Sequence, residues 1–505
     1  MLSFVTSGGL HGIECFPVCV ETDISEGLPI FEFVGFLSSE VREARERVKT
    51  ALKNSGFSLP VKHVTVNLSP AGLKKSGTGF DLAIALSLLL VIGAIKPDCL
   101  SDTFVAGELR LSGDIRGIPG ILPMVICAKK NGLKRCIVPS DNAVEGAVVE
   151  GIEVYGIDTL SNVVSFLNGS LNLDPCTDSS GNNLVGSIQY NNDLSDIQGQ
   201  EFARRALEIA ASGMHNMLMI GPPGAGKTML AKCIPTILPP LSHDESLEVS
   251  TIYSVGGKLD NNNSLITNRP FVEPHHSASS IALTGGGGII RPGCVSYADK
   301  GVLFMDEFPE FSRESLEALR QPLEERKVHI IRSRDSLTFP ADFMLIAAMN
   351  PCPCGAYPDL RKCTCTDAMR KRYIGKVSKP ILDRIDICIQ VEKVTAESLL
   401  TKDPGESSAM VRERVIRTRQ IQSERFREYG ITVNSQMTND LTERFCDLGI
   451  KEKELMRNII SKYDISARTY YRLLKVARTI ADMEQSDKIS SDHLFEAVRL
   501  KVSLE

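Results

Sequence analysis

The stretch MLMIGPPGAGKT at residues 217–228 decides the fold of this chain. Four apolar residues lead into a loop that fits the pattern G-x-x-x-x-G-K-[ST], and helix-forming residues follow it. Glycines let successive backbone N–H groups turn toward phosphate oxygens, and the positive end of the following helix adds to the attraction. The pattern therefore predicts a strand, a phosphate-binding loop and a helix. The alternative is a glycine-rich turn between two core elements.

The residue types of this loop predict which groups bind ATP and Mg²⁺. We expect Lys227 to reach the β and γ phosphates and the Thr228 hydroxyl to ligate Mg²⁺. The predicted nucleotide-binding residues are Gly221, Pro222, Pro223, Gly224, Ala225, Gly226, Lys227 and Thr228.

Two further apolar runs end in polar side chains that suit phosphate hydrolysis. Val302 to Met305 end at Asp306, which we expect to hold Mg²⁺ through water, and at Glu307, which would polarise the attacking water. An ordinary strand followed by an acidic turn is the alternative. Residues 345–349 end at Asn350, whose amide suits positioning that water or sensing the γ phosphate.

Two arginines complete the predicted catalytic set. Arg384 and Arg468 are expected to neutralise charge on the transferring phosphoryl group. For an isolated arginine a surface salt bridge is the ordinary role. Here five motifs follow one another in the order and spacing of a AAA+ ATPase, which favours catalysis.

Bulk properties place the chain among ordinary globular proteins. Its 505 residues suggest two to four domains, and 24% charged with 43% hydrophobic residues are usual values. A net charge of −5 leaves only a local surface for any nucleic acid. The apolar run at residues 82–95 is shorter than the roughly 20 residues that span a bilayer, so we expect a buried helix there and no membrane contact. Fourteen cysteines without an export signal favour a reduced cytoplasm.

The pattern of the whole chain predicts an α/β protein with three folded parts. Residues 1–170 alternate strand-like runs at 18–24 and 63–68 with helical runs at 39–55 and 121–131, so they form a compact α/β domain. Asn, Asp, Ser and Gly then dominate a linker at residues 171–195. The ATPase core follows at residues 196–394. Residues 395–505 show helical periodicity without strand runs, which predicts an α-helical lid.

Specific segments of the first domain resemble a known family. NLSPA at residues 67–71 and KKSGTGFDLA at residues 74–83 resemble the amino-terminal domain of ComM/YifB proteins, the magnesium-chelatase-like ATPases. That domain is similar to the Lon protease domain and to the ribosomal S5 fold, which implies an α+β arrangement. When Lys75 is aligned with the lysine of the Lon motif, Gly79 occupies the place of the nucleophilic serine. Without a hydroxyl nothing attacks a peptide bond, although Ser76 keeps a protease among the alternatives.

The resemblance extends through the ATPase core. His275 to Ser279 and the glycine-rich run after them resemble the helix-2 insert of magnesium chelatase and ComM ATPases, and the two histidines are read as structural parts of it. Residues 327–343 take the place of the pre-sensor hairpin. The hairpin implies DNA contact by Arg332 and Arg334, with a solvated turn as the alternative.

The resemblance also implies roles for three sites outside the phosphate loop. By likeness to related ATPases, backbone groups of residues 197–200 contact the adenine base. Likeness to MCM-type helicases implies that Arg384 is an arginine finger for the neighbouring subunit's nucleotide. Arg468 matches the sensor 2 arginine, and whether it acts within one subunit or between two stays open.

Four cysteines directly follow the Asn350 strand. Cys352, Cys354, Cys363 and Cys365 form the pattern C-x-C-x8-C-x-C. Four thiolates at this spacing suit a tetrahedral Zn²⁺ ion. Free structural thiols or a redox switch are the alternatives.

Membership of this family implies a homohexameric DNA motor that uses ATP and Mg²⁺. The expected partners are single-stranded or branched DNA and recombination proteins, and the expected process is branch migration in recombination or natural transformation. The alternatives are an ATPase subunit of magnesium-chelatase type that remodels a protein partner, an ATP-dependent protease and a non-catalytic scaffold.

Overall fold

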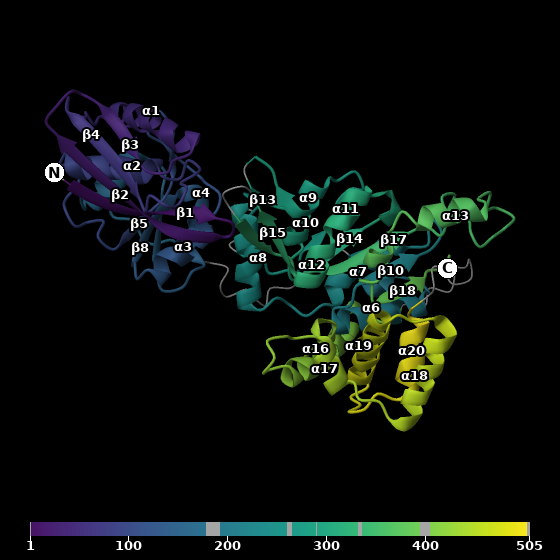
Figure 1. Cartoon of the computed structure of the whole chain (residues 1–505). Helices are drawn as coiled ribbons and strands as arrows, with labels where there is room; N and C mark the ends of the chain where they lie inside the picture. Colours follow the sequence, from purple (N-terminus) through teal and green to yellow (C-terminus); the bar gives the residue numbers. More distant parts are fainter. Residues whose placement is uncertain are drawn as a thin grey trace. The chain divides into compact units, whose positions relative to one another are not determined.

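The structure divides the chain into two compact units, which are described separately. The computed structural model describes residues 2–177, 192–259, 265–288, 290–331, 336–393 and 405–501. Unit 1 comprises Met1–Gly186, His243–Thr267 and Ile331–Leu337, and unit 2 comprises Ser187–Ser242, Asn268–Ile330 and Thr338–Glu505. Figure 1 shows the elements of both units in chain order. No described helix is long and apolar enough to cross a bilayer.

Unit 1 is built on a seven-stranded mixed sheet of order β3-β4-β2-β1-β5-β8-β9. Its strands are β1 (Leu2–His11), β2 (Glu14–Ser25), β3 (Phe31–Val34), β4 (His63–Ser69), β5 (Thr103–Val105), β8 (Arg135–Pro139) and β9 (Glu153–Ile157). The two longest strands, β1 and β2, form an antiparallel hairpin, whereas β5, β8 and β9 run parallel. A short antiparallel pair, β6 (Glu108–Leu109) and β7 (Ile115–Arg116), stands outside this sheet.

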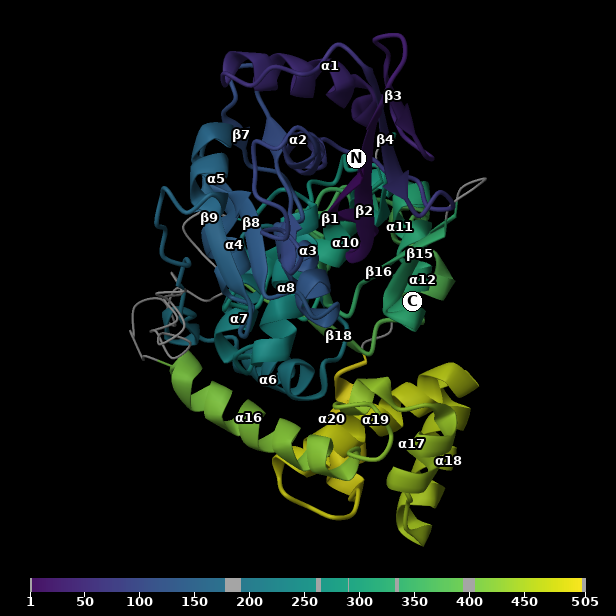
Figure 2. The same cartoon turned by 90° about the vertical axis from the view of Figure 1, so that its left-hand side faces the viewer.

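The helices of unit 1 pack against this sheet or against one another. They are α1 (Ser39–Asn54), α2 (Asp81–Val91), α3 (Ile121–Lys130), α4 (Ser140–Ala147), α5 (Leu160–Leu167) and α8 (His243–Val255). The apolar run that predicted a buried helix is α2 (Figure 2), and its first nine residues are all buried. Because every side of α2 packs, its sequence shows no polar face.

Helix α8 lies far along the chain from the rest of unit 1, inside the sequence expected to form the ATPase core. It packs against α3, where Gly120 N donates to Ser254 O at 3.0 Å and the Ser254 hydroxyl binds the Glu145 carboxylate. Burial raises the pKa of Glu145. A segment that follows the phosphate loop in sequence is therefore an integral part of unit 1.

Unit 2 contains a five-stranded parallel sheet of order β11-β14-β17-β10-β18. The strands are β11 (Phe271–Val272), β14 (Val302–Met305), β17 (Met344–Met349), β10 (Met217–Ile220) and β18 (Ile387–Gln390). The three central strands are buried along their whole length. Strands covered on both faces are expected to read as continuous apolar runs, which is how the sequence identified them.

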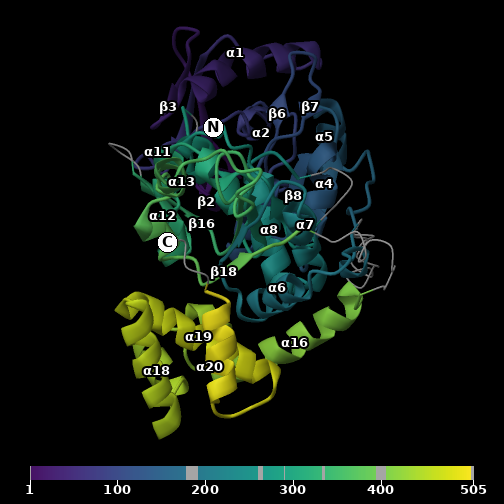
Figure 3. The ribbon, with the colours of Figure 1, turned by 90° about the vertical axis from the view of Figure 1, so that its right-hand side faces the viewer.

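The helices of unit 2 fall into a group around the sheet and a carboxy-terminal group. The first group is α6 (Glu201–Gly213), α7 (Lys227–Ile237), α9 (Ser280–Thr284), α10 (Cys294–Tyr297), α11 (Arg313–Ala318), α12 (Arg320–Glu325), α13 (Asp367–Ile374) and α14 (Lys379–Leu382). The second is α16 (Ser408–Arg425), α17 (Asn439–Phe445), α18 (Ile450–Tyr463), α19 (Ala467–Met483) and α20 (Ser491–Arg499) (Figure 3). The predicted α/β architecture with a helical carboxy-terminal region is confirmed.

Local signals set the ends of two helices as expected. The Ser466 hydroxyl caps α19 by accepting from Thr469 N at 3.3 Å. Helix α6 ends at Gly213, as predicted, but the residue with positive φ is Met214. Gly213 is needed for another reason, since a Cβ there would lie 2.3 Å from His215 Nε2.

Candidate nucleotide-binding site

The carboxyl ends of three neighbouring strands converge on one edge of the unit 2 sheet. Gly221 follows β10, Asp306 follows β14 and Asn350 follows β17. Strands β14, β17 and β10 are adjacent and parallel, so their ends meet at the edge where open α/β sheets bind ligands. We call these residues, with the loop 221–228, the phosphate-loop cluster.

Lys227 is held inside the phosphate loop by oxygen acceptors. Its Nζ donates to Gly221 O at 2.7 Å, to Pro222 O at 3.1 Å and to Asn350 Oδ1 at 3.2 Å. Only 8% of the residue is exposed, and burial lowers the pKa of its ammonium group. The same ammonium suits phosphate oxygens, because a nucleotide supplies stronger acceptors than backbone carbonyls.

Thr228 and Asp306, the two residues predicted to hold Mg²⁺, contact each other. Thr228 Oγ1 donates to Asp306 Oδ2 at 2.9 Å, and Glu307 N donates to Asp306 Oδ1 at 2.8 Å. A hydroxyl and a carboxylate are hard oxygen ligands that Mg²⁺ accepts beside nucleotide phosphates. These residues therefore fit the ion.

Glu307 stands in a conformation that a side chain rarely adopts, with φ of 51°. Its carboxylate lies 3.1 Å from His276 Nδ1, and the His275 and His276 rings are tilted against each other with centroids 4.1 Å apart. Sequence reasoning took both histidines as structural parts of the insert and missed this contact. No local pattern signals it, because 31 positions separate the partners.

Gln200 connects the segment predicted beside the adenine base to the phosphate loop. Its Nε2 donates to Ala225 O at 3.4 Å and to Glu392 O at 2.5 Å. Residues 197–200 are thus placed next to the loop, and their contact with the base stays a prediction.

The two predicted catalytic arginines converge on one carboxylate that sequence reasoning missed. Arg384 and Arg468 both bind Glu324 Oε1, and the Arg468 contact measures 2.8 Å. The Arg384 guanidinium holds the pKa of Glu324 below its ordinary value. We call these three residues the arginine cluster.

Arg384 is buried in unit 2. It is 3% exposed, and its Nη1 donates to Pro380 O at 2.6 Å. Its Nε has no hydrogen-bond partner among the described residues. By contrast, the Arg468 side chain is 47% exposed. In the part of the chain that the structure describes, both guanidiniums contact Glu324 and neither contacts the phosphate loop.

A second ion pair ties the arginine cluster to the carboxy-terminal helices. Asp386, two residues after Arg384, binds Arg472 of α19 and lies 3.3 Å from His215 Nδ1. Burial would raise the pKa of Asp386, but Arg472 and His215 outweigh it and hold the pKa well below its usual range. Arg472 follows Arg468 by one helical turn, so α19 is fixed to the segment around Arg384 at two points.

The arginine-rich helix α16 uses several of its cations internally. Arg414 binds Glu208 and Glu406, Arg419 donates to Ala211 O and Arg425 binds Asp482. These contacts join α16 to α6 and α19, which favours a structural role for this part of the charge.

The predicted hairpin is present as β15 (Lys327–Ile331) and β16 (Ser336–Pro340), which form a two-stranded sheet. The predicted DNA contacts Arg332 and Arg334 lie outside the described residues.

The four cysteines after Asn350 come together. Cys352, Cys354, Cys363 and Cys365 place their sulfur atoms within 4.8 Å of one another. All four thiols are free of disulfides.

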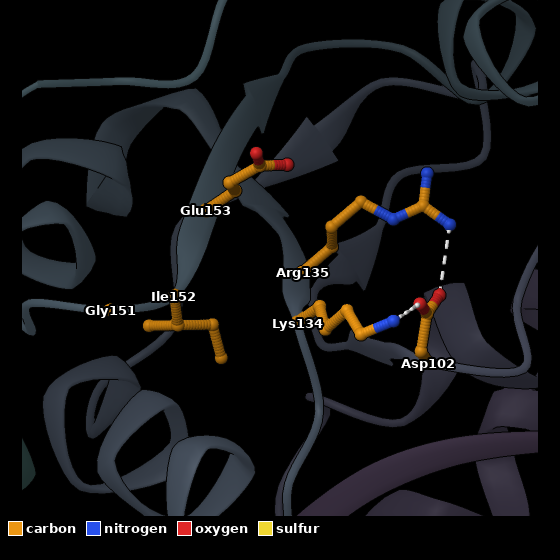
Figure 4. A pocket seen from close by; sticks show the side chains of 6 residues that line it. All are labelled: Asp102, Lys134, Arg135, Gly151, Ile152 and Glu153. Atoms are coloured by element: carbon orange, nitrogen blue, oxygen red, sulfur yellow. Dashed lines mark hydrogen bonds and ion pairs between the residues drawn. The ribbon is translucent and has the colours of Figure 1, made fainter.

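A cavity of about 490 Å³ lies elsewhere, in unit 1, and is lined by Asp102, Lys134, Arg135, Gly151, Ile152 and Glu153. None of the predicted site residues lines it. Figure 4 shows that its two cations point to Asp102, with Arg135 at 3.1 Å and Lys134 at 3.5 Å. The two carboxylates of the lining, Asp102 and Glu153, offset its two cations, so the cavity has no net positive charge to attract a phosphate.

Family models match most of the chain. "Subunit ChlI of Mg-chelatase" matches residues 20–142, "Magnesium chelatase, subunit ChlI" residues 193–399, and the ChlI carboxy-terminal model residues 405–501. Competence protein ComM of Haemophilus influenzae is 41% identical over 98% of this chain and 97% of its own length. YifB of Escherichia coli is 41% identical over 98% and 96%. An archaeal Lon protease of Methanocaldococcus jannaschii is 32% identical over 23% of this chain and 18% of its own.

Proposed function

Because the chain belongs to the ComM/YifB family of magnesium-chelatase-like AAA+ ATPases, we propose that it is a ring-forming, ATP-driven DNA motor. The proposed ring is a homohexamer, the proposed track is single-stranded or branched DNA, and the proposed process is branch migration during recombination or natural transformation. The proposed compartment is the cytoplasm. Recombination proteins are the proposed partners.

The observation that carries this proposal is the separation of the two clusters. The phosphate-loop cluster assembles the groups that bind phosphate and Mg²⁺, whereas Arg384 and Arg468 contact Glu324. A pocket without a guanidinium lacks transition-state charge stabilisation worth about 10³–10⁵ in turnover. An arginine from a neighbouring protomer supplies that charge in the proposed ring.

Glu307 and Lys227 are the proposed agents of chemistry within each pocket. Glu307 polarises the attacking water. Lys227 exchanges its carbonyl acceptors for phosphate oxygens when ATP binds, and its hydrogen bond with Asn350 then breaks. Mg²⁺ neutralises phosphate charge when bound to Thr228 and Asp306. Zn²⁺ is the further proposed cofactor, at the four cysteines.

DNA as the track is supported by the name of the ComM relative, a competence protein, and by the hairpin β15–β16. Arg332 and Arg334 are the proposed contacts with DNA phosphates. Neutralising phosphates releases counterions, so each arginine is expected to contribute roughly one unit to the salt slope of DNA binding.

Action on a protein partner is the second candidate, since the models that match 193–399 and 405–501 describe a magnesium chelatase subunit. Proteolysis has less support. Gly79 has no hydroxyl, and a Cβ at this position would meet Ile118 Cδ1 at 2.8 Å.

ATP turnover measured with and without nucleic acid tests the proposal. We expect branched or single-stranded DNA to increase ATP turnover by the wild type. In the double variant Arg332→Ala/Arg334→Ala we expect a smaller increase. The matched control is Arg457→Ala, an exposed arginine of α18. Turnover that ignores every DNA offered and rises only with a protein partner would favour the second candidate.

A further inference from the structure

We propose that Cys352, Cys354, Cys363 and Cys365 bind one Zn²⁺ ion, and that this ion braces the phosphate loop, so that metal occupancy controls nucleotide binding and turnover. The effect on turnover rests on the proposed ATPase function. The metal site itself does not.

The distances between the sulfur atoms fit a tetrahedral ion. Cys352 Sγ lies 3.4 Å from Cys354 Sγ and 3.8 Å from Cys363 Sγ, and Cys354 and Cys363 are 3.6 Å apart. Four zinc–sulfur bonds of about 2.3 Å place the sulfurs about 3.8 Å apart at the corners of a tetrahedron. A disulfide requires about 2.05 Å. The thiols are therefore arranged around a point and not joined in pairs.

The thiolate is the form of cysteine that binds metal, and each of the four free thiols can supply one. Tetrahedral sulfur sites select zinc or iron, and a protein that keeps its thiols reduced without redox chemistry favours zinc.

The cysteine loop lies against the phosphate loop within unit 2. A Cβ at Gly355 would be 2.6 Å from Pro223 Cδ, so only glycine allows this approach, and its φ of 75° also favours glycine. Gly355 N donates to Cys352 O at 2.9 Å, which closes the turn between the first two cysteines. The turn that touches Pro223 is thus shaped by the first pair of sulfur ligands.

The cysteine loop also begins directly after Asn350, which contacts Lys227. Cys352 is two positions after Asn350, whose Oδ1 accepts from Lys227 Nζ at 3.2 Å. Arg370 of α13 lies over the Tyr357 ring, 4.2 Å from its centroid, so α13 contacts the far side of the loop. An ion at the four sulfurs ties these contacts into one rigid wall of the pocket.

Loss of the ion leaves four thiols at sulfur contact distance with nothing to hold them there. The loop then gains conformational freedom. Nucleotide binding must order it again, and the conformational entropy lost in that step reduces the affinity. Weaker nucleotide binding and slower turnover follow, both without any change in the residues that touch ATP.

Metal analysis with nucleotide binding tests the inference. Purified, fully reduced wild type is expected to contain about one zinc ion per chain, and Cys363→Ser to lose it. We expect Cys363→Ser to bind a fluorescent ADP analogue and to turn over ATP on the order of tenfold less well. The matched control is Cys99→Ser, an unclustered thiol in unit 1, which should keep the metal and both activities.

A second arm uses the wild type alone, so that a folding defect of Cys363→Ser does not decide the outcome. Chelation of the metal should weaken nucleotide binding, and added Zn²⁺ should restore it. Reduced wild type without zinc, or with iron instead, would contradict the metal assignment. Zinc whose removal leaves nucleotide binding unchanged would contradict the bracing role. A protein that binds zinc and nucleotide yet ignores DNA would refute the motor and leave this inference standing.

Discussion

The phosphate-loop cluster and the arginine cluster are assembled in different ways. The first is built at adjacent strand ends, and its polar groups contact one another within hydrogen-bond distance. The second gathers Glu324, Arg384 and Arg468 from three remote segments, and its cations neutralise a carboxylate of the same chain. One chain thus holds a nucleotide site ready for phosphate but keeps its arginines elsewhere. The difference supports the proposal that hydrolysis needs a second protomer.

The largest effect is expected when a substitution breaks the arginine cluster. Arg384→Ala should lower ATP turnover by about 10³–10⁵ while nucleotide affinity stays near wild type, because the lost charge acts only on the transferring phosphate. Steady-state turnover and equilibrium binding measure the two effects. Arg320→Ala, an exposed arginine paired with Glu317, is the matched control. An equal loss of affinity and turnover would place Arg384 in the ground-state pocket instead.

The next effect concerns the fixation of α19. Asp386→Asn leaves Arg472, whose side chain is only 20% exposed, without its carboxylate partner, so we expect the free energy of unfolding of unit 2 to fall by about 3 kcal/mol at neutral pH. The folded pKa of Asp386 lies below the unfolded value of about 3.9, so this stabilisation is present above that pH and is lost as the pH falls through the folded pKa.

Denaturant unfolding of both proteins at neutral and acidic pH measures this difference. Asp383→Asn, in the same segment but less buried, should change stability by under about 1 kcal/mol. A difference between wild type and Asp386→Asn that grows as the solution becomes acidic would refute the ion-pair explanation.

The smallest effect sharpens the description of the phosphate-loop cluster. His276→Ala removes the group 3.1 Å from the Glu307 carboxylate, and we expect turnover to fall about tenfold with KM for ATP nearly unchanged. His276→Asn, which keeps a donor, should recover part of the loss. His275→Ala is the control, because its Nδ1 faces Ser277 Oγ at 2.8 Å. Equal losses in both alanine variants would reduce His276 to a packing role.

Sequence alone predicted the parts of the molecule that depend on local signals. Strand β14, the end of β17 at Asn350, the buried helix α2 and the cap of α19 by Ser466 follow from apolar runs, turn residues and capping chemistry. These features need no knowledge of distant partners. The phosphate loop belongs to this class.

Features that depend on distant partners were not predictable. Glu324 lies on a short helix among other charged residues, and nothing nearby marks it as the partner of two arginines. Arg47 lies among other charged residues of α1, and nothing nearby marks it as the partner of the buried Asp81, 2.9 Å away. Helix α8 packs in unit 1, although its sequence follows the phosphate loop. In each case a contact between segments that are distant in sequence determines where the residue or helix lies. Such a contact leaves no periodic pattern in a single sequence.

Mixing two inactive variants tests the shared pocket most directly. Glu307→Gln should bind ATP and assemble without turnover, and Arg384→Ala should keep an intact pocket without its arginine. In mixed rings roughly one interface in four pairs an intact Glu307 with an intact Arg384, so turnover should reappear in the mixture. Recovered ATP hydrolysis is the predicted result. Its absence at every mixing ratio, in rings shown to contain both variants, would contradict a site built by two protomers.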